Sequence, residues 1–113
     1  MKVPNAVNAI IAPEKLRDYL LNPEHRRGRS KAKKLLSMGY QPAQWQRLED
    51  DLRLQHLTVD IDSTEKNEYG IAYVIVAELT GPNGNAAVFR SVWQIDVGMD
   101  RARLITMYPE WKP

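Results

Sequence analysis

The chain has 113 residues, of which 43% are hydrophobic and 27% are charged, as is ordinary for a soluble globular protein of one domain. Its 16 Lys or Arg residues against 14 Asp or Glu residues leave a formal net charge of only +2 at pH 7. The chain has no cysteine, which excludes a disulfide scaffold, a thiolate metal site and a cysteine nucleophile. We therefore expect one domain that spans residues 1–113.

The sequence shows no sign of a membrane partner. Its first residues, MKVPNAVNAIIAPEKL, lack the continuous apolar run of a signal peptide. No apolar run approaches the roughly 20 residues that a helix needs to cross a bilayer. We therefore expect a cytoplasmic protein, or a domain cut from a larger one.

Helical spacing of apolar residues runs from about residue 13 to residue 57. Pro13 suits the first position of a helix, and Leu16, Tyr19 and Leu20 then form its buried face. Asn22-Pro23 ends this helix, because the residue before a proline avoids the α region.

Two more helices are predicted after it. One begins at Gly28 or Ser30 and ends near Gly39, and the next opens at Pro42. The residues predicted to face inward from these two helices are Ala32, Leu35, Leu36, Trp45, Leu48 and Leu52.

The spacing changes near Asp60 from helical to extended. Residues 58–68 are polar and acidic and predict a loop. Three antiparallel strands are predicted, at 69–79, 86–97 and 102–108. Asn83-Gly84 is a strong hairpin signal between the first two. Helices followed by a β-meander predict an α+β fold, with the N-terminal helices packed on one sheet face and the other face open.

Positive charge is concentrated in one segment, HRRGRSKAKK, from His25 to Lys34. A local basic field attracts polyanions even when the net charge is small. The candidate nucleic-acid-binding residues are Arg26, Arg27, Arg29, Lys33 and Lys34. The alternative is that these residues form only the solvated face of a helix.

The same segment contains candidate catalytic residues. His25 lies in a predicted loop, where an imidazole can act as a general base. Lys31 lies one turn into the basic helix and could neutralise charge on a phosphate. A surface histidine and a solvated lysine are the alternatives. His56, at the end of the third predicted helix, is expected to act as a cationic cap of the helix dipole.

The predicted strands add three candidates. Arg90 is centred in a strand that buries Phe89 and must therefore face the open side of the sheet, where a guanidinium suits bidentate phosphate contact. Thr106 and Tyr108 share one face of the last strand and could donate hydrogen bonds to a phosphate, or the tyrosine could stack on a base. Their alternative role is that of good strand formers.

Metal and cofactor sites are not indicated. The two histidines lie far apart in the sequence, and neither HxH nor HExxH occurs. Asp60-x-Asp62 with Glu65 lacks the spacing and central glycine of an EF-hand. No GxxxxGK[ST] or GxGxxG motif appears, so we expect neither a metal nor a cofactor.

The chain resembles a bacterial domain family of uncharacterised function along nearly its whole length. The matching motifs, in chain order, are Pro4-Asn5-Ala6, KLxxYLLNPEH at 15–25, GxxKA at 28–32, Trp45, Tyr69-Gly70, LTGPNG at 79–84, R[ST]xW at 90–93 and TxYP at 106–109. Arg26 departs from the pattern, because members usually have proline after the histidine. Such domains occur alone and at the C-termini of contact-dependent toxins. They are similar to the ribonuclease fold shared by barnase, EndoU, colicins D and E5, and RelE.

The resemblance implies a metal-independent, toxin-type ribonuclease that acts on RNA. His25 would then take the proton of a 2′-hydroxyl, and Lys31 and Arg90 would hold the scissile phosphate. Thr106 or Tyr108 would assist by hydrogen bonding. A protein inhibitor of the immunity type is the implied protein partner. The alternative is a non-catalytic nucleic-acid- or protein-binding module of the same fold.

Overall fold

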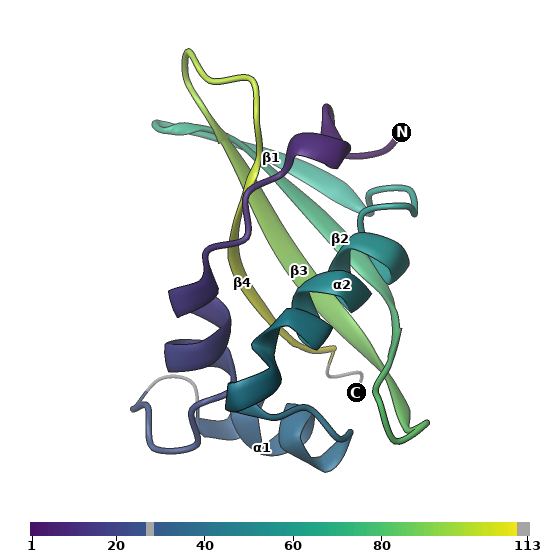
Figure 1. Ribbon diagram of the computed structural model, residues 1–113. Helices are drawn as coiled ribbons and strands as arrows, with labels where there is room; N and C mark the ends of the chain where they lie inside the picture. Colours follow the sequence, from purple (N-terminus) through teal and green to yellow (C-terminus); the bar gives the residue numbers. More distant parts are fainter. Residues whose placement is uncertain (27–28, 111–113) are drawn as a thin grey trace.

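The computed structural model describes residues 1–26 and 29–110. Its elements are the 3₁₀ helix η1 (Ala6–Asn8), the π-helix η2 (Lys15–Leu20), α1 (Arg29–Ser37), the 3₁₀ helix η3 (Pro42–Gln44), α2 (Trp45–Gln55), β1 (Ser63–Asn67), β2 (Gly70–Thr80), β3 (Ala86–Asp96) and β4 (Arg103–Pro109). Every helix precedes every strand within these residues, so the predicted α+β organisation is confirmed (Figure 1). None of the described helices has the length and apolarity that crossing a membrane would need.

The sheet is an antiparallel meander, and over the described residues its strand order is β1-β2-β3-β4. The predicted hairpin is present, since Thr80 pairs with Ala86 across a turn in which Gly84 has a φ of 88°. The prediction of a loop over 58–68 was wrong for Ser63–Asn67, which forms the edge strand β1. All five of its side chains are exposed, so no apolar alternation marks it, and backbone pairing with β2 makes it a strand.

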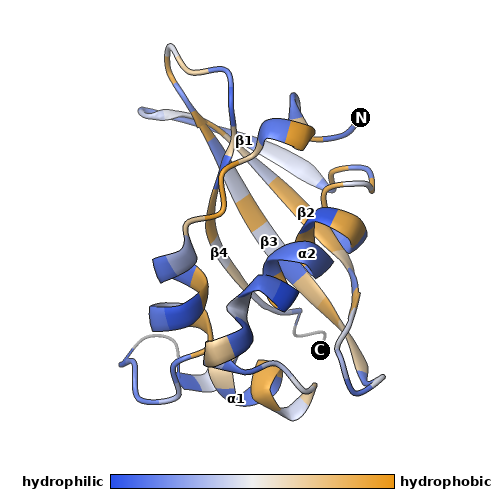
Figure 2. Ribbon diagram, in the orientation of Figure 1, coloured by the Kyte–Doolittle hydropathy of each residue, from blue (hydrophilic) through white to orange (hydrophobic). Residues whose placement is uncertain are grey.

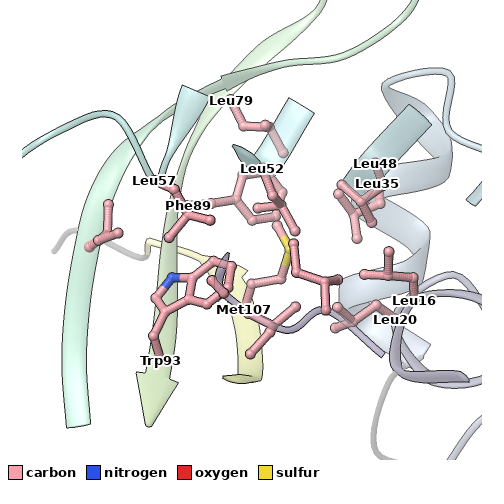
Figure 3. Close-up of a cluster of buried hydrophobic side chains, with 14 of the residues drawn as sticks. Leu16, Leu20, Leu35, Leu48, Leu52, Leu57, Leu79, Phe89, Trp93 and Met107 are labelled. Atoms are coloured by element: carbon pink, nitrogen blue, oxygen red, sulfur yellow. The ribbon is translucent and has the colours of Figure 1, made fainter. Parts of the chain in front are cut away.

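The helices cover one face of the sheet, and the core lies between the two layers (Figure 3). Phe89, Ser91 and Trp93 of β3 are buried on this face, whereas Arg90 and Val92 between them are only partly buried. Leu16, Leu20, Leu35, Leu48, Leu52, Leu57, Leu79 and Met107 join this core. Trp45, which was predicted to face inward, packs at the margin of this core, as does Ile95 of β3. Figure 2 shows hydrophobic and hydrophilic residues alternating along α2, as one buried face requires.

The first predicted helix takes a wider form than the apolar spacing suggested. Lys15–Leu20 is π-helical, and Leu21 N–H donates to the Leu16 carbonyl at 2.9 Å, five residues back. This wider turn brings Leu16, Leu20 and Leu21 onto the buried side. Tyr19 is thereby turned partly out of the core, which corrects its prediction as a core residue.

The N-terminal segment lies against the start of β4. Ile10 N–H donates to the Ala102 carbonyl at 2.7 Å, and Leu104 N–H donates to the Ile10 carbonyl at 3.0 Å. These bonds form a short parallel bridge between Ile10 and Arg103. The chain then continues through η2, which packs beside the later part of β4.

His56 corrects a second expectation. It is fully buried between α2 and the sheet, with Nδ1 2.7 Å from Ser91 Oγ and Nε2 3.2 Å from the Ala77 carbonyl oxygen. A carbonyl can only accept, so Nε2 carries the proton and Nδ1 accepts from Ser91. Trp93 Nε1 in turn donates to Ser91 Oγ at 2.9 Å. Burial lowers the pKa of His56 to about 4, so the imidazole is neutral and is not the cationic helix cap that was predicted.

Gly81 provides a test of how closely the β2–β3 turn approaches the loop after α1. A Cβ added at Gly81 would lie 2.3 Å from the Met38 carbonyl oxygen and 2.7 Å from Met38 Cβ. We expect Gly81→Ala to lower the free energy of unfolding by about 2 kcal/mol, because backbone must move to admit the methyl group. Urea unfolding measures this. The exposed neighbour Pro82 supplies the control variant Pro82→Ala, which should cost less. Equal stability of Gly81→Ala and the wild type would contradict the close approach.

Candidate functional site

A pocket of about 430 Å³ opens where η2, α1 and the later part of β4 meet. These elements lie side by side at the β4 edge of the sheet (Figure 1). The pocket is lined by Lys15, Tyr19, His25, Lys31, Ile105 and Thr106. The structure therefore brings together three of the predicted catalytic residues, His25, Lys31 and Thr106.

Lys31 connects the two sides of this pocket. Burial of Ala32 and Leu35 fixes the rotation of α1 and turns Lys31 toward β4. Its ammonium donates to the Tyr19 hydroxyl at 2.5 Å and to Thr106 Oγ1 at 3.1 Å. Lys31 is thus a partly buried and oriented cation rather than a solvated one.

Tyr19 lies at the centre of the site. Its ring meets the His25 ring edge-on, with the ring centroids 4.7 Å apart and the planes at 76°. The ammonium groups of Lys31 and Lys15 lie 4.8 Å and 5.8 Å from the Tyr19 ring centroid. Such distances are within the range of cation–π attraction, so these contacts also hold the ring in place.

The electrostatics of the pocket act on the Tyr19 hydroxyl. Partial burial alone would raise the pKa of Tyr19, because it disfavours the phenolate. The hydrogen bonds from Lys31 and Thr106, together with the charges of Lys31 and Lys15, outweigh burial and lower the pKa below its ordinary value of 10. Tyr19 is therefore a stronger acid than an exposed tyrosine.

A β-bulge shapes the strand side of the pocket. Val92 pairs with Thr106 but Trp93 pairs with Leu104, so Ile105 is an extra residue in β4. The bulge lets consecutive residues, Ile105 and Thr106, both line the pocket. The pairing of Thr106 with Val92 and of Tyr108 with Arg90 confirms that Thr106 and Tyr108 share one face. The Lys31 ammonium lies 5.9 Å from the Tyr108 ring centroid, so Tyr108 borders the site.

Arg90 lies on the predicted face but outside the pocket. It projects from the side of β3 opposite Phe89, beside Tyr108. Its guanidinium is held by Glu110, with Nε 2.8 Å from Oε2 and Nη2 3.0 Å from Oε1. A phosphate would have to compete with this carboxylate, so the structure does not join Arg90 to His25 and Lys31.

The rest of the basic segment lies on the outside of the molecule. Arg26, Arg29, Lys33 and Lys34 are exposed, and Arg27 lies outside the described residues. Lys33 and Lys34, with Ser30 and Ser37, line a shallow hollow of about 350 Å³ on the outer side of α1. One helix thus carries a pocket cation, Lys31, and a separate exposed basic face.

The search for chemical groups did not single out Tyr19 or Lys15, although both belong to the KLxxYLLNPEH motif at 15–25. Tyr19 fits the apolar spacing of the first helix, so the pattern assigned it to the core. A signal was present nonetheless, since a tyrosine with a lysine four residues earlier interrupts an otherwise aliphatic face.

The groups in the pocket suit anion binding and proton transfer. An ammonium, an imidazole, a phenol and an aliphatic hydroxyl line it together. Among residues 1–26 and 29–110, no group of three or more His, Asp or Glu side chains is placed to hold a metal ion. The site can therefore attract a phosphate and move a proton with these side chains.

The fold and the pocket define an α+β protein with helices on one sheet face and a basic pocket at the sheet edge. Over residues 2–111 the sequence matches the model of DUF6883, a domain of unknown function, and the chain belongs to this family. The expected membership of a family of unknown function is thereby confirmed. No curated protein matches the chain.

A solved structure shares the fold. It is titled a contact-dependent growth inhibition toxin–immunity protein complex from Klebsiella pneumoniae 342. One of its chains is similar to this one with a TM-score of 0.65 and 17% sequence identity, over 95% of this chain and 97% of that chain. At this identity the likeness establishes the architecture of the chain.

Proposed function

We propose that this domain is a toxin-type endoribonuclease that works without a metal ion. The observation that carries the proposal is the meeting of Lys31, His25 and Thr106 in one open pocket, although Thr106 is 75 residues from Lys31. The shared fold with a chain of a toxin–immunity protein complex supports a toxin-like role and an immunity-type protein as its inhibitor.

The chemistry follows from the substrate. RNA carries its own nucleophile, the 2′-hydroxyl, so cleavage requires a base and a group that stabilises charge on phosphorus. His25 takes the 2′-hydroxyl proton, and the 2′-oxygen attacks the adjacent phosphorus. The Lys31 ammonium stabilises the negative charge that develops on the phosphoryl oxygens, and Thr106 assists by hydrogen bonding to Lys31. Tyr108, at the border of the site, is placed to contact the neighbouring nucleotide.

The exposed basic residues give this site a path for a polyanion. Arg26 and Arg29 lie in or beside the loop that holds His25, and Lys33 and Lys34 extend along α1. Phosphate contacts by such residues position a nucleic acid without reading its sequence. We propose that they bind the RNA backbone on either side of the scissile linkage.

Replacing His25 tests this mechanism. We expect the wild type to cleave RNA in EDTA, and His25→Ala to be slower by about 100-fold, because it has lost its general base. The exposed neighbour Glu24 supplies the control variant Glu24→Ala, which should retain activity. Gel analysis of single-stranded RNA measures the rates.

Either of two outcomes would contradict the proposed mechanism: loss of wild-type cleavage on adding EDTA, or full activity of His25→Ala. Tight RNA binding without cleavage under any condition would instead support a non-catalytic binding module of this fold.

A further inference from the structure

Tyr19 and His25 face the same pocket with their rings in contact. Cleavage by a 2′-hydroxyl involves two proton transfers, one away from the 2′-oxygen and one to the departing 5′-oxygen. The proposed function gives His25 the first transfer and leaves the second without a donor. Tyr19 is the neighbouring group with a proton to give.

The hydrogen bond from Lys31 fixes how the Tyr19 hydroxyl is used. An ammonium group has donors and no acceptor, so the phenol oxygen must accept from Lys31. A phenol carries one hydrogen, and that hydrogen therefore points away from Lys31. Lys31 also holds Thr106, so the three polar atoms form a fixed group at the pocket wall.

The hydrogen bond from Lys31 also favours loss of the proton from the Tyr19 hydroxyl. When a phenol ionises, the negative charge appears on the oxygen that the Lys31 ammonium already touches. Lys15, with its ammonium 5.8 Å from the ring centroid, adds a second positive charge nearby. Both effects lower the pKa of Tyr19, as a general acid requires.

We propose that Tyr19 is a catalytic residue that acts as the general acid, and this assignment rests on the proposed function. As the bond from phosphorus to the 2′-oxygen forms, the bond from phosphorus to the 5′-oxygen breaks. The Tyr19 O–H gives its proton to that 5′-oxygen. The products are a 2′,3′-cyclic phosphate and a free 5′-hydroxyl, and Tyr19 is left as a phenolate against the Lys31 ammonium. The proton taken up by His25 restores the phenol through solvent, so the protons balance over one turnover.

A substrate that needs no acid tests this assignment. The probe is an RNA oligonucleotide cut at a mapped linkage, together with the same oligonucleotide carrying sulfur in place of the 5′-oxygen of that linkage. A thiolate leaves without being protonated. We expect Tyr19→Phe to lower kcat on the oxygen substrate by about 100-fold and to leave the sulfur substrate nearly unaffected. His25→Ala should slow both substrates, because each still needs its 2′-hydroxyl deprotonated.

Tyr69, which is exposed on the β1–β2 turn and away from the pocket, supplies the matched control Tyr69→Phe. The pH dependence of the wild-type cleavage rate gives a second test, which does not depend on whether a variant folds. The wild-type rate should begin to fall at a lower alkaline pH with the oxygen substrate, as Tyr19 loses its proton, than with the sulfur substrate.

Equal losses on both substrates in Tyr19→Phe would overturn the acid role and make Tyr19 a residue that only positions Lys31. An alkaline fall with the same midpoint on both substrates would do the same. A wild-type protein that cleaves no RNA at all would instead overturn the proposed function, and the role of Tyr19 with it.

Discussion

Replacing Lys31 with alanine is expected to lower kcat for RNA cleavage by roughly 1,000-fold. The Lys31 ammonium is the positive charge that contacts both Tyr19 and Thr106, so its loss removes charge stabilisation and the partner of the Tyr19 phenolate together. Substrate affinity should change much less, because on the proposed function the exposed basic residues make most of the contacts with the RNA backbone. Single-turnover cleavage at saturating protein isolates this effect on kcat.

Lys33 offers a matched comparison on the same helix. It is exposed and lines the outer hollow of α1 rather than the pocket. We expect Lys33→Ala to weaken RNA binding and to reduce its dependence on salt, since one phosphate contact is lost, with little change in kcat. If Lys31→Ala also changed only affinity and salt dependence, Lys31 would be one more backbone contact and the pocket would not be catalytic.

Acidification from pH 7 to pH 4 is expected to cost the folded state roughly 3 kcal/mol through His56 alone. The pKa of His56 is lowered by burial from 6.5 to about 4. Between pH 6.5 and pH 4 the imidazole is protonated in the unfolded chain but neutral in the folded protein. The free energy of unfolding therefore falls as the pH falls through this interval. Well above pH 6.5, from about pH 8, the imidazole is neutral in both states and contributes no pH dependence.

His56→Gln isolates this contribution from that of the carboxylates. Glutamine has no titrating group, so the variant should be less stable than the wild type at pH 7 but should lose less stability on acidification. Urea unfolding of both proteins at pH 7, 5.5 and 4.5 gives the comparison. Parallel losses in the two proteins would mean that His56 is protonated in the folded state and that Nδ1 does not accept from Ser91 Oγ there.

Much of the architecture was predictable because the residues that form it also show the right period. The alternation of Phe89, Arg90 and Ser91 predicted which of them face the helices, and the structure agrees. Strand β1 lacked that signal, since its residues are all exposed and its pairing is a backbone property. The Arg90–Glu110 pair escaped prediction because alternation gives the face of a side chain but not its partner.

Three residues of the candidate site were predictable from the sequence, but their assembly was not. Chemistry singled out His25, Lys31 and Thr106, yet chain order cannot show that α1 lies against β4. The π-helical form of η2 depends on packing in the core, and the apolar spacing is also compatible with an α-helix. Tyr19 was missed for that reason, because its exposure to the pocket depends on one wide turn.

The contact between Lys31 and Thr106 also determines when the pocket comes into existence. The two residues are separated by 75 positions, and Thr106 lies in β4, which pairs with β3. Such a contact can form only when a long stretch of chain has been closed into a loop. A nascent chain still on the ribosome, or a fragment cleaved before β4, lacks one wall of the site. On the proposed function, the site therefore becomes able to act on RNA only after synthesis has passed β4.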